Sequence, residues 1–301
     1  IKNYNSIFNA EIIKELLKKN KLKFEGVSIN SKEIKKDNLF VAIKGKNHDG
    51  HVFVQEALKN KANFCVVQRN INKLNKKKLI KFPNTINFLN KLAVLKRNHI
   101  NLKVIAITGS SGKTTLKTLI GKTLKEYGKT YFSKKSYNNH IGVPLSLCNL
   151  ESDHKYGVFE IGMSNKGEIR NLSSLVKPDI AIITNIGEAH IENFNNLNEI
   201  AKAKSEIIEN INRGGYLILN RDDKYFSYIS NLAKKKNINV LCFGLSNKEH
   251  AKLIKKRRYK NYDDLHIRIL DKNIHLKIKN TNSLIISNIL CTLLTLHVLD
   301  L

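Results

Sequence analysis

The stretch that decides the fold runs Val104-Ile105-Ala106-Ile107-Thr108-Gly109-Ser110-Ser111-Gly112-Lys113-Thr114-Thr115. Its apolar first part predicts a buried strand, its glycines and serines predict a tight loop, and an amphipathic helix is expected from Thr114 onward. Between a strand and a helix, glycine lets backbone N–H groups turn inward around an anion, and the helix N-terminus adds its dipole. Lys113 is placed to reach the β- and γ-phosphates of a nucleotide, and the Thr114 hydroxyl to ligate Mg²⁺. Residues 108–115 are therefore predicted to bind the phosphates of ATP.

The loop is a variant, because the strict pattern has glycine where Ile107 stands. A chance Gly-Lys-Thr in a turn would not need the flanking strand and helix, so nucleotide binding is the stronger interpretation. A phosphate loop names a cofactor but not a reaction. Motors, kinases, GTPases and ligases all use one, and the rest of the chain has to discriminate between them.

Apolar runs and helical patterns alternate on the C-terminal side of this loop. Strands are predicted at residues 157–161, 180–184, 216–220 and 240–243, and helices at residues 114–126, 166–175, 197–211 and 222–235. Near-continuous apolar strands separated by helices are typical of a parallel sheet covered on both faces. Residues 265–270 and 274–278 alternate apolar and polar around Asp271-Lys272-Asn273, which predicts an antiparallel hairpin. We predict an α/β protein with a mostly parallel sheet and this small hairpin.

The first hundred residues have a different pattern. A helix is predicted at residues 7–19, short strands at 39–43 and 64–67, a second helix at 52–60 and a surface loop at 70–78. The polar segment 96–101 marks a domain boundary near residue 98. We expect an N-terminal α/β domain at residues 1–98 and a central phosphate-loop domain at residues 99–301.

The chain carries a formal net charge of +28 over 301 residues, with a pI near 9.9. A face that binds nucleic acid would concentrate this charge, use Arg and interleave aromatic side chains. The lysines are instead scattered along the whole chain, which favours a compositional bias, and no nucleic-acid partner is predicted. A basic surface would still attract a polyanionic nucleotide substrate.

Neither a membrane span nor a disulfide is predicted. The apolar stretch 283–301 contains Asn288 and His297, so a packed helix is expected there. The four cysteines are far apart, and Cys65 and Cys242 lie in apolar runs, as expected for buried thiols in a reducing compartment. No signal peptide is recognised at the start of the sequence. We expect a cytoplasmic protein.

Two further residues, Glu160 and His190, are candidates for a metal site. Glu160 ends a predicted parallel strand, where a carboxylate is costly unless it meets a cation, so it is either a Mg²⁺ ligand or a Glu that simply emerges from the sheet. His190 follows the strand 180–184 in a glycine-containing turn and is either a ligand or a satisfied histidine. Lys204 lies on a predicted helix, where a lysine is normally part of a solvated face.

The segment Asn138-Asn139-His140-Ile141-Gly142-Val143-Pro144 stands out in a chain with 3 prolines. Side-chain amides beside a Gly-Val-Pro turn could hold a substrate phosphate or carboxylate. A simple turn before the next helix is an equally good interpretation.

These pieces, in this order, resemble the Mur ligases of bacterial cell-wall synthesis. The resemblance covers nearly the whole chain and rests on the phosphate loop, Glu160-Ile161-Gly162, the turn from Thr184 to His190 and Ala201-Lys202-Ala203-Lys204. Residues 138–145 and Gly167-Glu168-Ile169 are similar to the branch that adds D-alanyl-D-alanine (D-Ala-D-Ala) to UDP-N-acetylmuramoyl-tripeptide. In the first domain, Asn30-Ser31-Lys32, residues 38–45 and His48-Asp49-Gly50-His51 resemble the uridine-nucleotide-binding domain of that branch.

The resemblance implies an ATP-dependent amide ligase. ATP would phosphorylate the substrate carboxylate, and the amine of D-Ala-D-Ala would attack the acyl phosphate to give an amide, ADP and phosphate. It implies catalytic roles for Lys113, Lys204 and His190, and Mg²⁺ ligation by Thr114, Glu160, His190 and a carbamylated Lys204. Asn139 and Asn288 would join residues 108–115 in binding ATP. Substrate contacts are implied for Ser31, Lys44, Gly45, Asp49, Gly50, His51 and Asn138.

The sequence also differs from the family pattern. Asn30-Ser31-Lys32 stands where relatives usually have Asp-Ser-Arg, and Lys does not grip phosphate with two parallel bonds as Arg does. Leu284-Ile285 stand where a His-Asn pair often precedes the helix that carries Asn288. Relatives continue into a third, Rossmann-like domain, which we expect this chain to lack. Another Mur branch, a folylpolyglutamate or cyanophycin synthetase, and a remnant that only binds nucleotide are the alternatives, and we expect a monomer.

Overall fold

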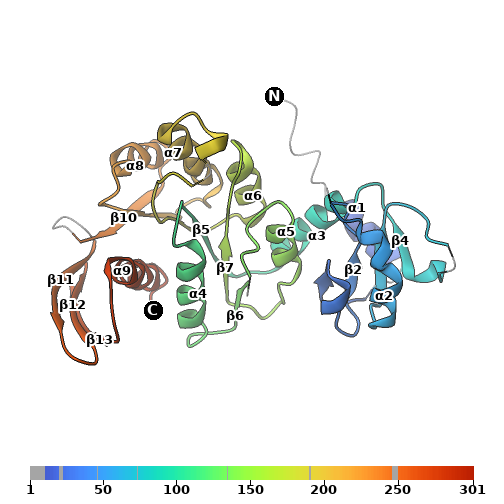
Figure 1. The fold of residues 1–301 in the computed structure, drawn as a ribbon, viewed down its shortest axis with the longest axis horizontal. Helices are drawn as coiled ribbons and strands as arrows, with labels where there is room; N and C mark the ends of the chain where they lie inside the picture. Colours follow the sequence, from blue (N-terminus) through green and yellow to red (C-terminus); the bar gives the residue numbers. More distant parts are fainter. Residues whose placement is uncertain are drawn as a thin grey trace. The chain divides into compact units, whose positions relative to one another are not determined.

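The computed structural model describes residues 11–19, 23–45, 47–72, 74–133, 135–189, 191–245 and 250–301. The chain forms two compact units (Figure 1). The first comprises residues up to Asn101 together with Ile141–Ser152, and the second comprises Leu102–His140 and Asp153–Leu301. The sequence had placed residues 141–152 in the second domain. They join the first unit because their helix α5 (Gly142–Cys148) is buried along its whole length and packs against α3 (Thr85–His99).

The first unit contains a four-stranded parallel sheet in the order β1-β2-β3-β4. Its strands are β1 (Val27–Ser28), β2 (Leu39–Val41), β3 (Phe64–Val67) and β4 (Leu79–Lys81). Its other helices are α1 (Glu11–Lys19) and α2 (Val54–Lys59), with single 3₁₀ turns at η2 (Ser31–Glu33), η3 (Gly50–Phe53) and η4 (Lys76–Lys78). The predicted strands β2 and β3 and the helix α2 are present, and the first four residues of the predicted helix 7–19 lie outside the described residues.

The helix α3 was not predicted from the sequence. Its N-terminus has a clear signal, because the side chain of Asn84 accepts a hydrogen bond from the backbone N–H of Asn87. The helix buries Phe88, Leu89 and Leu92. Its last turn lies in the polar segment 96–101 that we interpreted as a domain boundary.

The second unit contains a nine-stranded sheet in the order β13-β12-β11-β10-β9-β8-β5-β7-β6. Its parallel part consists of β5 (Lys103–Thr108), β6 (Thr130–Phe132), β7 (Tyr156–Glu160), β8 (Ile180–Ile183), β9 (Tyr216–Asn220) and β10 (Asn239–Gly244). The predicted parallel sheet is confirmed, and β6 is a parallel strand that the sequence did not reveal. The direction of chain travel reverses at β5: the next strand, β6, lies on one side of it, and β8, β9 and β10 follow on the other.

Helices cover both faces of this sheet (Figure 1). The helices α4 (Lys113–Leu124) and α9 (Ser283–Val298) pack against each other on one face. The helices α6 (Glu168–Val176), α7 (Leu197–Ser205) and α8 (Phe226–Lys234) lie on the opposite face, as right-handed crossovers running in opposite directions require. Two 3₁₀ turns, η5 (Ile191–Asn193) and η6 (Glu206–Asn210), flank α7. Within the described residues, no helix has the length and apolarity that a membrane crossing requires.

The predicted hairpin is part of a larger antiparallel extension. The strands β12 (Asp263–Ile269) and β13 (Lys272–Ile278) pair as expected, and β11 (Ala251–Arg258) adds a third strand and joins them to β10. Alternate residues of β12 are buried against α9.

A buried carboxylate, Asp263, joins this extension to the chain just before α9. It accepts hydrogen bonds from the hydroxyl and backbone N–H of Thr281, and it pairs with Lys256 and Arg258. The Thr281 hydrogen bonds and the two cations hold the pKa of Asp263 well below its usual range. The carboxylate is therefore ionised at neutral pH.

Candidate active site

The candidate site lies at the carboxyl end of β5, between the ends of two neighbouring strands. In the sheet register, Ile107 is opposite Glu160 of β7, and Thr108 is opposite Ile183 of β8. The loop that follows β5 therefore emerges with Glu160 on one side and the turn after β8 on the other. A crevice at such a reversal of strand order is where open α/β sheets bind their ligands.

Thr184 and Asn185, in the turn after β8, hold the phosphate loop in shape. The side-chain oxygen of Asn185 accepts hydrogen bonds from the backbone N–H groups of Ser110 and Ser111, at 3.2 and 3.0 Å. The Thr184 hydroxyl donates to the carbonyl of Ser111 at 2.6 Å, and the Thr184 N–H donates to the carbonyl of Thr108 at 3.0 Å. The turn was part of the family pattern, but the sequence did not assign these two residues a role.

Gly109 is required at its position for two reasons. Its φ of +144° lies in a region that side chains rarely adopt, and a Cβ there would collide with the Thr184 hydroxyl. Gly112, with a φ of +79°, directly precedes the first residue of α4. Both glycines of the motif thus serve the close turn from β5 into the helix.

The ammonium of Lys113 lies over the loop that it follows. Its Nζ donates to the carbonyl of Gly109 at 2.7 Å and to that of Ser110 at 3.4 Å. Burial lowers the pKa of Lys113, and the nearby carboxylate of Glu160 opposes this shift. Lys113 is therefore a partly buried cation at the mouth of the loop, as a phosphate-binding lysine would be.

Glu160 is buried and is held by two residues that the sequence had placed in the site. Thr114 donates its hydroxyl to Oε2 of Glu160 at 2.7 Å, and Asn138 donates its amide to Oε1 at 2.8 Å. The Ser136 hydroxyl lies 3.1 Å from that of Thr114. Asn138 comes this close because Gly162 has no side chain: a Cβ there would lie 3.0 Å from the Asn138 amide carbon.

Glu160, Thr114, Asn138 and Ser136 form a hydrogen-bonded group, here called the Glu160 cluster. This cluster and the phosphate loop line one open pocket of about 430 Å³. Its walls are formed by Ser110, Ser111, Gly112, Lys113, Thr114, Thr115, Ser136, Asn138 and Glu160. The pocket thus combines backbone N–H groups, one ammonium, two hydroxyl-bearing side chains near a carboxylate and one amide. This set suits a phosphate chain accompanied by a divalent cation.

Lys117, which the sequence analysis did not identify, lies beside the Glu160 cluster. It is fully buried, and its Nζ lies 3.8 Å from Oε2 of Glu160 and donates to Ser133 Oγ and to the carbonyl of Lys135. Burial lowers the pKa of Lys117 and Glu160 raises it. Its spacing was a possible signal, because residues four apart on a helix share a face, and Lys117 follows Lys113 by four.

Lys204 is buried on α7, with a relative exposure of 2%. Burial and the charge of Lys113 lower the pKa of Lys204 to about 7. Among the described residues, no hydrogen-bond acceptor or acidic partner contacts its ammonium. A neutral amine is therefore well populated at Lys204 near neutral pH, unlike at an ordinary helical lysine.

Three more residues were predicted to bind ATP or its metal ion. His190 lies outside the described residues. Asn139 is exposed and is not among the residues that line the pocket. Asn288 is buried on α9, and its side-chain oxygen lies 4.0 Å from the position that a Cβ on Gly112 would take.

In the first unit, the predicted substrate residues Lys44, Gly45, Asp49, Gly50 and His51 form one tight turn. Lys44 and Asp49 form an antiparallel bridge, Gly45 N–H donates to the carbonyl of His48, and Gly50 N–H donates to that of Ile43. The Asp49 carboxylate accepts hydrogen bonds from the N–H of His51 and from Arg69. Hydrogen bonds from the backbone and ring of His51 lower the pKa of Asp49.

His51 and Ser31 are also fixed by neighbours. The Nε2 of His51 accepts a hydrogen bond from the N–H of Gln68, so its Nδ1 carries the proton that faces Asp49. The Ser31 hydroxyl donates to Glu56 at 2.6 Å, and Asn60 donates to the Ser31 carbonyl. Both side chains thus hold the turn and the start of η2 in place.

The Lys117–Glu160 contact gives a testable prediction about stability. We expect Lys117→Met to lower the free energy of unfolding by about 3–5 kcal/mol, because it removes the buried one of the two cations that neutralise the Glu160 carboxylate. The matched control is Lys122→Met on the exposed face of the same helix, which should change it by less than about 0.5 kcal/mol. Urea denaturation followed by circular dichroism measures both. Equal stability of the two variants would show that Lys117 does not balance the Glu160 charge.

Comparisons with known proteins identify the family to which the chain is similar. The Mur ligase middle domain matches residues 107–296, and the catalytic domain of the Mur ligase family matches residues 23–97. The UDP-N-acetylmuramoyl-tripeptide--D-alanyl-D-alanine ligase of Rickettsia prowazekii is 39% identical over 76% of this chain and 51% of its own length. The ligase of the same name from Bacillus subtilis is 36% identical over 66% of this chain and 44% of its own length. The chain therefore spans about half the length of the curated relatives that it matches.

Solved structures show the same relationship. MurF from Acinetobacter baumannii superposes with a TM-score of 0.81 and 28% identity, over 91% of this chain and 60% of that one. MurF ligase from Thermotoga maritima in complex with ADP superposes with a TM-score of 0.79 and 28% identity, over 92% of this chain and 63% of that one. With a domain model matching most of its length and both units accounted for, the chain belongs to the Mur ligase family.

Proposed function

We propose that this protein takes part in an ATP-dependent amide ligation that joins D-Ala-D-Ala to UDP-N-acetylmuramoyl-tripeptide. The observation that carries the proposal is the pairing of Thr114 and Asn138 with the two oxygens of Glu160, inside the pocket that the phosphate loop forms. The relatives named for this reaction support it, as does the relative whose structure contains ADP. The reaction itself is inferred from proteins about twice as long as the matched region.

The donor atoms around Glu160 fit Mg²⁺. Hydroxyl and carboxylate oxygens are the ligands that Mg²⁺ prefers, and Glu160 and Thr114 present such oxygens 2.7 Å apart at the pocket wall. Thr114 and Glu160 would therefore hold the ion, with His190 and a carbamylated Lys204 as the proposed ligands of a second one. When bound, Mg²⁺ neutralises charge on the transferring phosphoryl group.

In this proposal the protein positions the reactants and forms no covalent bond with them. The N–H groups of the loop and the Lys113 ammonium hold the β- and γ-phosphates, so that the γ-phosphoryl group faces the substrate carboxylate. Asn138, which lines the pocket, and its neighbour Asn139 would contact the reacting phosphate. The amine of D-Ala-D-Ala then attacks the acyl phosphate, and the tetrahedral intermediate collapses to the amide and phosphate.

The remaining proposed contacts are those to the uridine nucleotide and to the adenine of ATP. The turn that contains Lys44, Gly45 and Asp49 would bind the uridine nucleotide together with Gly50, His51 and Ser31. Asn288, which lies near Gly112, would contact the adenine. We propose that a monomer carries out the reaction in the cytoplasm. The four free cysteines are all buried, which suits a reducing compartment.

The function is tested on the protein expressed from its complete reading frame. We expect phosphate release that requires ATP, Mg²⁺, UDP-N-acetylmuramoyl-tripeptide and D-Ala-D-Ala together. Lys113→Ala should lower the rate by at least about 100-fold, because a charge that stabilises the phosphoryl group is removed. The control Lys122→Ala, exposed on the same helix, should retain the rate. Phosphate release no faster than the background with all four components would contradict the proposed reaction.

The environment of Lys204 leads to a second test. A neutral lysine amine adds CO₂ to form a carbamate, and the pKa of about 7 makes this form available at neutral pH. With ¹³C-bicarbonate, we expect a carbamate signal in the NMR spectrum that grows between pH 6 and pH 8 as the amine deprotonates. Lys204→Gln should remove the signal, whereas Lys202→Gln, on an exposed position of the same helix, should leave it. A signal that survives in Lys204→Gln would show that another residue carries the carbamate.

A further inference from the structure

A second group of possible metal ligands lies on the antiparallel extension, outside the phosphate-loop pocket. In β12, Leu265, Ile267 and Ile269 are buried, so the intervening side chains face outward. Asp264 and His266 are two residues apart and therefore share this outer face. In the antiparallel register, His275 of β13 is directly opposite His266. The sheet itself thus brings two imidazoles and one carboxylate together.

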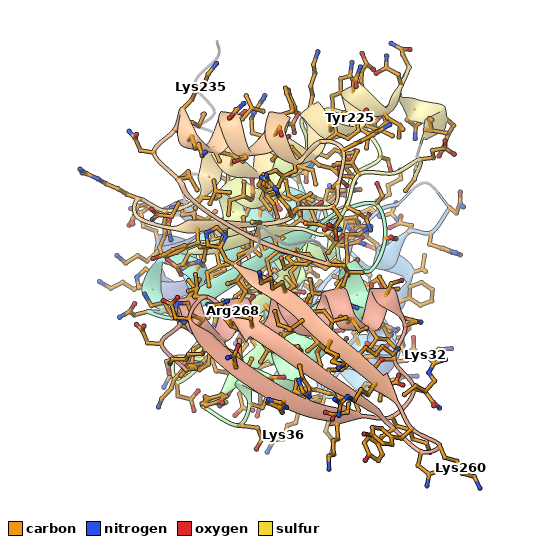
Figure 2. All side chains as sticks on the ribbon, turned by 90° about the vertical axis from the view of Figure 1, so that its left-hand side faces the viewer. Lys32, Lys36, Tyr225, Lys235, Lys260 and Arg268 are labelled. Atoms are coloured by element: carbon orange, nitrogen blue, oxygen red, sulfur yellow. The ribbon has the colours of Figure 1, made fainter. Side chains whose placement is uncertain are left out.

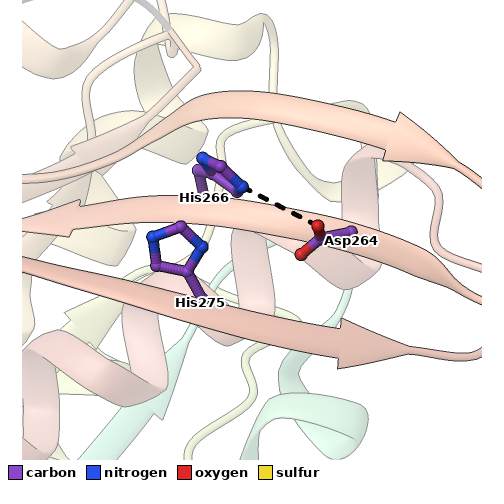
Figure 3. A group of neighbouring side chains, drawn as sticks. All are labelled: Asp264, His266 and His275. Carbon is purple, nitrogen blue, oxygen red and sulfur yellow. Dashed lines mark ion pairs between the residues drawn. The ribbon is translucent and has the colours of Figure 1, made fainter.

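The three side chains present their ligand atoms to one another (Figure 3). One ligand atom from each residue lies within 4.8 Å of the other two. Nε2 of His266 lies 3.7 Å from Oδ2 of Asp264, and the two imidazole rings have centroids 3.9 Å apart at an angle of 57°. The rings are tilted rather than stacked, with a nitrogen of each turned toward the side on which Asp264 lies. Small side-chain rotations would bring the three donors onto one ion.

The ligand set indicates which ion would bind. Two imidazoles and a carboxylate are typical ligands of Zn²⁺, which takes three protein ligands and one water in an open tetrahedral site. Mg²⁺ and Ca²⁺ prefer oxygen ligands and depend on negative charge, of which this group has one carboxylate. The site therefore suits Zn²⁺, or another divalent ion that prefers imidazole.

Charged neighbours on the same face support this choice. On β11, Lys255 is opposite His266 and Arg257 is opposite Asp264, and on β13 Lys277 is opposite Asp264. Figure 2 shows this side of the molecule toward the viewer, with Arg268 on the same sheet. The ammonium of Lys277 lies 5.4 Å from the ring centre of Tyr262. Such a basic face repels any divalent ion, and it disfavours most an ion such as Mg²⁺ that is held mainly by charge rather than by strong bonds to imidazole nitrogens.

We propose that Asp264, His266 and His275 form a binding site for one Zn²⁺ ion. The ion ties the edge strand β13 to its neighbour β12 and leaves one coordination position open to solvent. This site is independent of the proposed ligase reaction, because its residues lie apart from those that line the phosphate-loop pocket.

The experiment uses tag-free protein treated with a chelator, dialysed, and titrated with ZnCl₂ by calorimetry in excess Mg²⁺. The Mg²⁺ occupies sites built from oxygen ligands, so the titration reports those that prefer imidazole. We expect wild-type protein to bind one more equivalent of Zn²⁺ than His266→Ala/His275→Ala does. The single variant His275→Gln, at an exposed position, should bind this equivalent at least about 100-fold more weakly. The control His99→Ala, an exposed histidine on α3, should bind as the wild type does.

Circular dichroism without metal checks that each variant is folded, and His275→Gln alone provides the test if the double variant does not fold. A second readout is the melting temperature, which Zn²⁺ should raise in the wild type but not in His275→Gln. Equal stoichiometry and affinity in wild type and His275→Gln would overturn the proposal. Visible absorption bands of a tetrahedral Co²⁺ complex in the wild type, absent from His275→Gln, would support it.

Discussion

The position of β5 between β7 and β8 is the constraint on which the site depends. Because parallel strands end at the same edge of a sheet, the loop after β5 emerges beside the last residue of β7 and the turn after β8. Glu160 supplies the carboxylate on one side, and Asn185 holds the loop on the other. The loop is therefore shaped by hydrogen bonds to neighbours that lie far away in the sequence. Gly109 allows this approach because a larger residue would collide with Thr184.

The site contains more positive than negative side chains, and this excess of positive charge fits the anionic ligands proposed for it. One carboxylate, Glu160, faces the ammonium groups of Lys113 and Lys117, and the charge of Lys113 also reaches Lys204. Burial lowers the pKa of all three lysines, so positive charge is held there at a cost in free energy. A polyphosphate with its cation would relieve this cost. A carbamate on Lys204 would relieve it too, by replacing a buried ammonium with a carboxylate-like group.

Much of the fold could be predicted from the sequence, because apolar runs such as residues 104–107 and 216–220 have few alternatives to buried parallel strands. The apolar pattern of the sequence was a weaker guide where an element is buried by packing against another helix of its own unit. The helix α5 is buried against α3, a contact that no local pattern revealed. The strand β11 contains the run Lys255-Lys256-Arg257-Arg258, and these consecutive basic residues obscure the alternation of apolar and polar residues that would mark a strand.

The individual residues of the site were harder to predict than its loop. Lys117 resembled any other lysine in a chain with 53 basic residues, and only its burial beside Glu160 distinguishes it. Asn185 acts through contacts made across the sheet. The group formed by Asp264, His266 and His275 depends on the pairing of two strands, which a periodic pattern predicts only approximately. Spatial neighbours that come from distant segments are the part of the site that a single sequence does not specify.

The central claim is that Glu160 and the phosphate loop act together on ATP and its metal ion. Calorimetric measurement of ATP affinity with Mg²⁺ and with a chelator, in wild type and in Glu160→Gln, tests it most directly. Gln keeps the shape and the hydrogen-bond acceptor for Thr114 but removes the charge, and Glu126→Gln on the exposed surface is the control. Mg²⁺ should strengthen ATP binding at least about tenfold in the wild type, a difference of about 1.4 kcal/mol, and Glu160→Gln should lose this gain. An equal gain in Glu160→Gln would contradict the account.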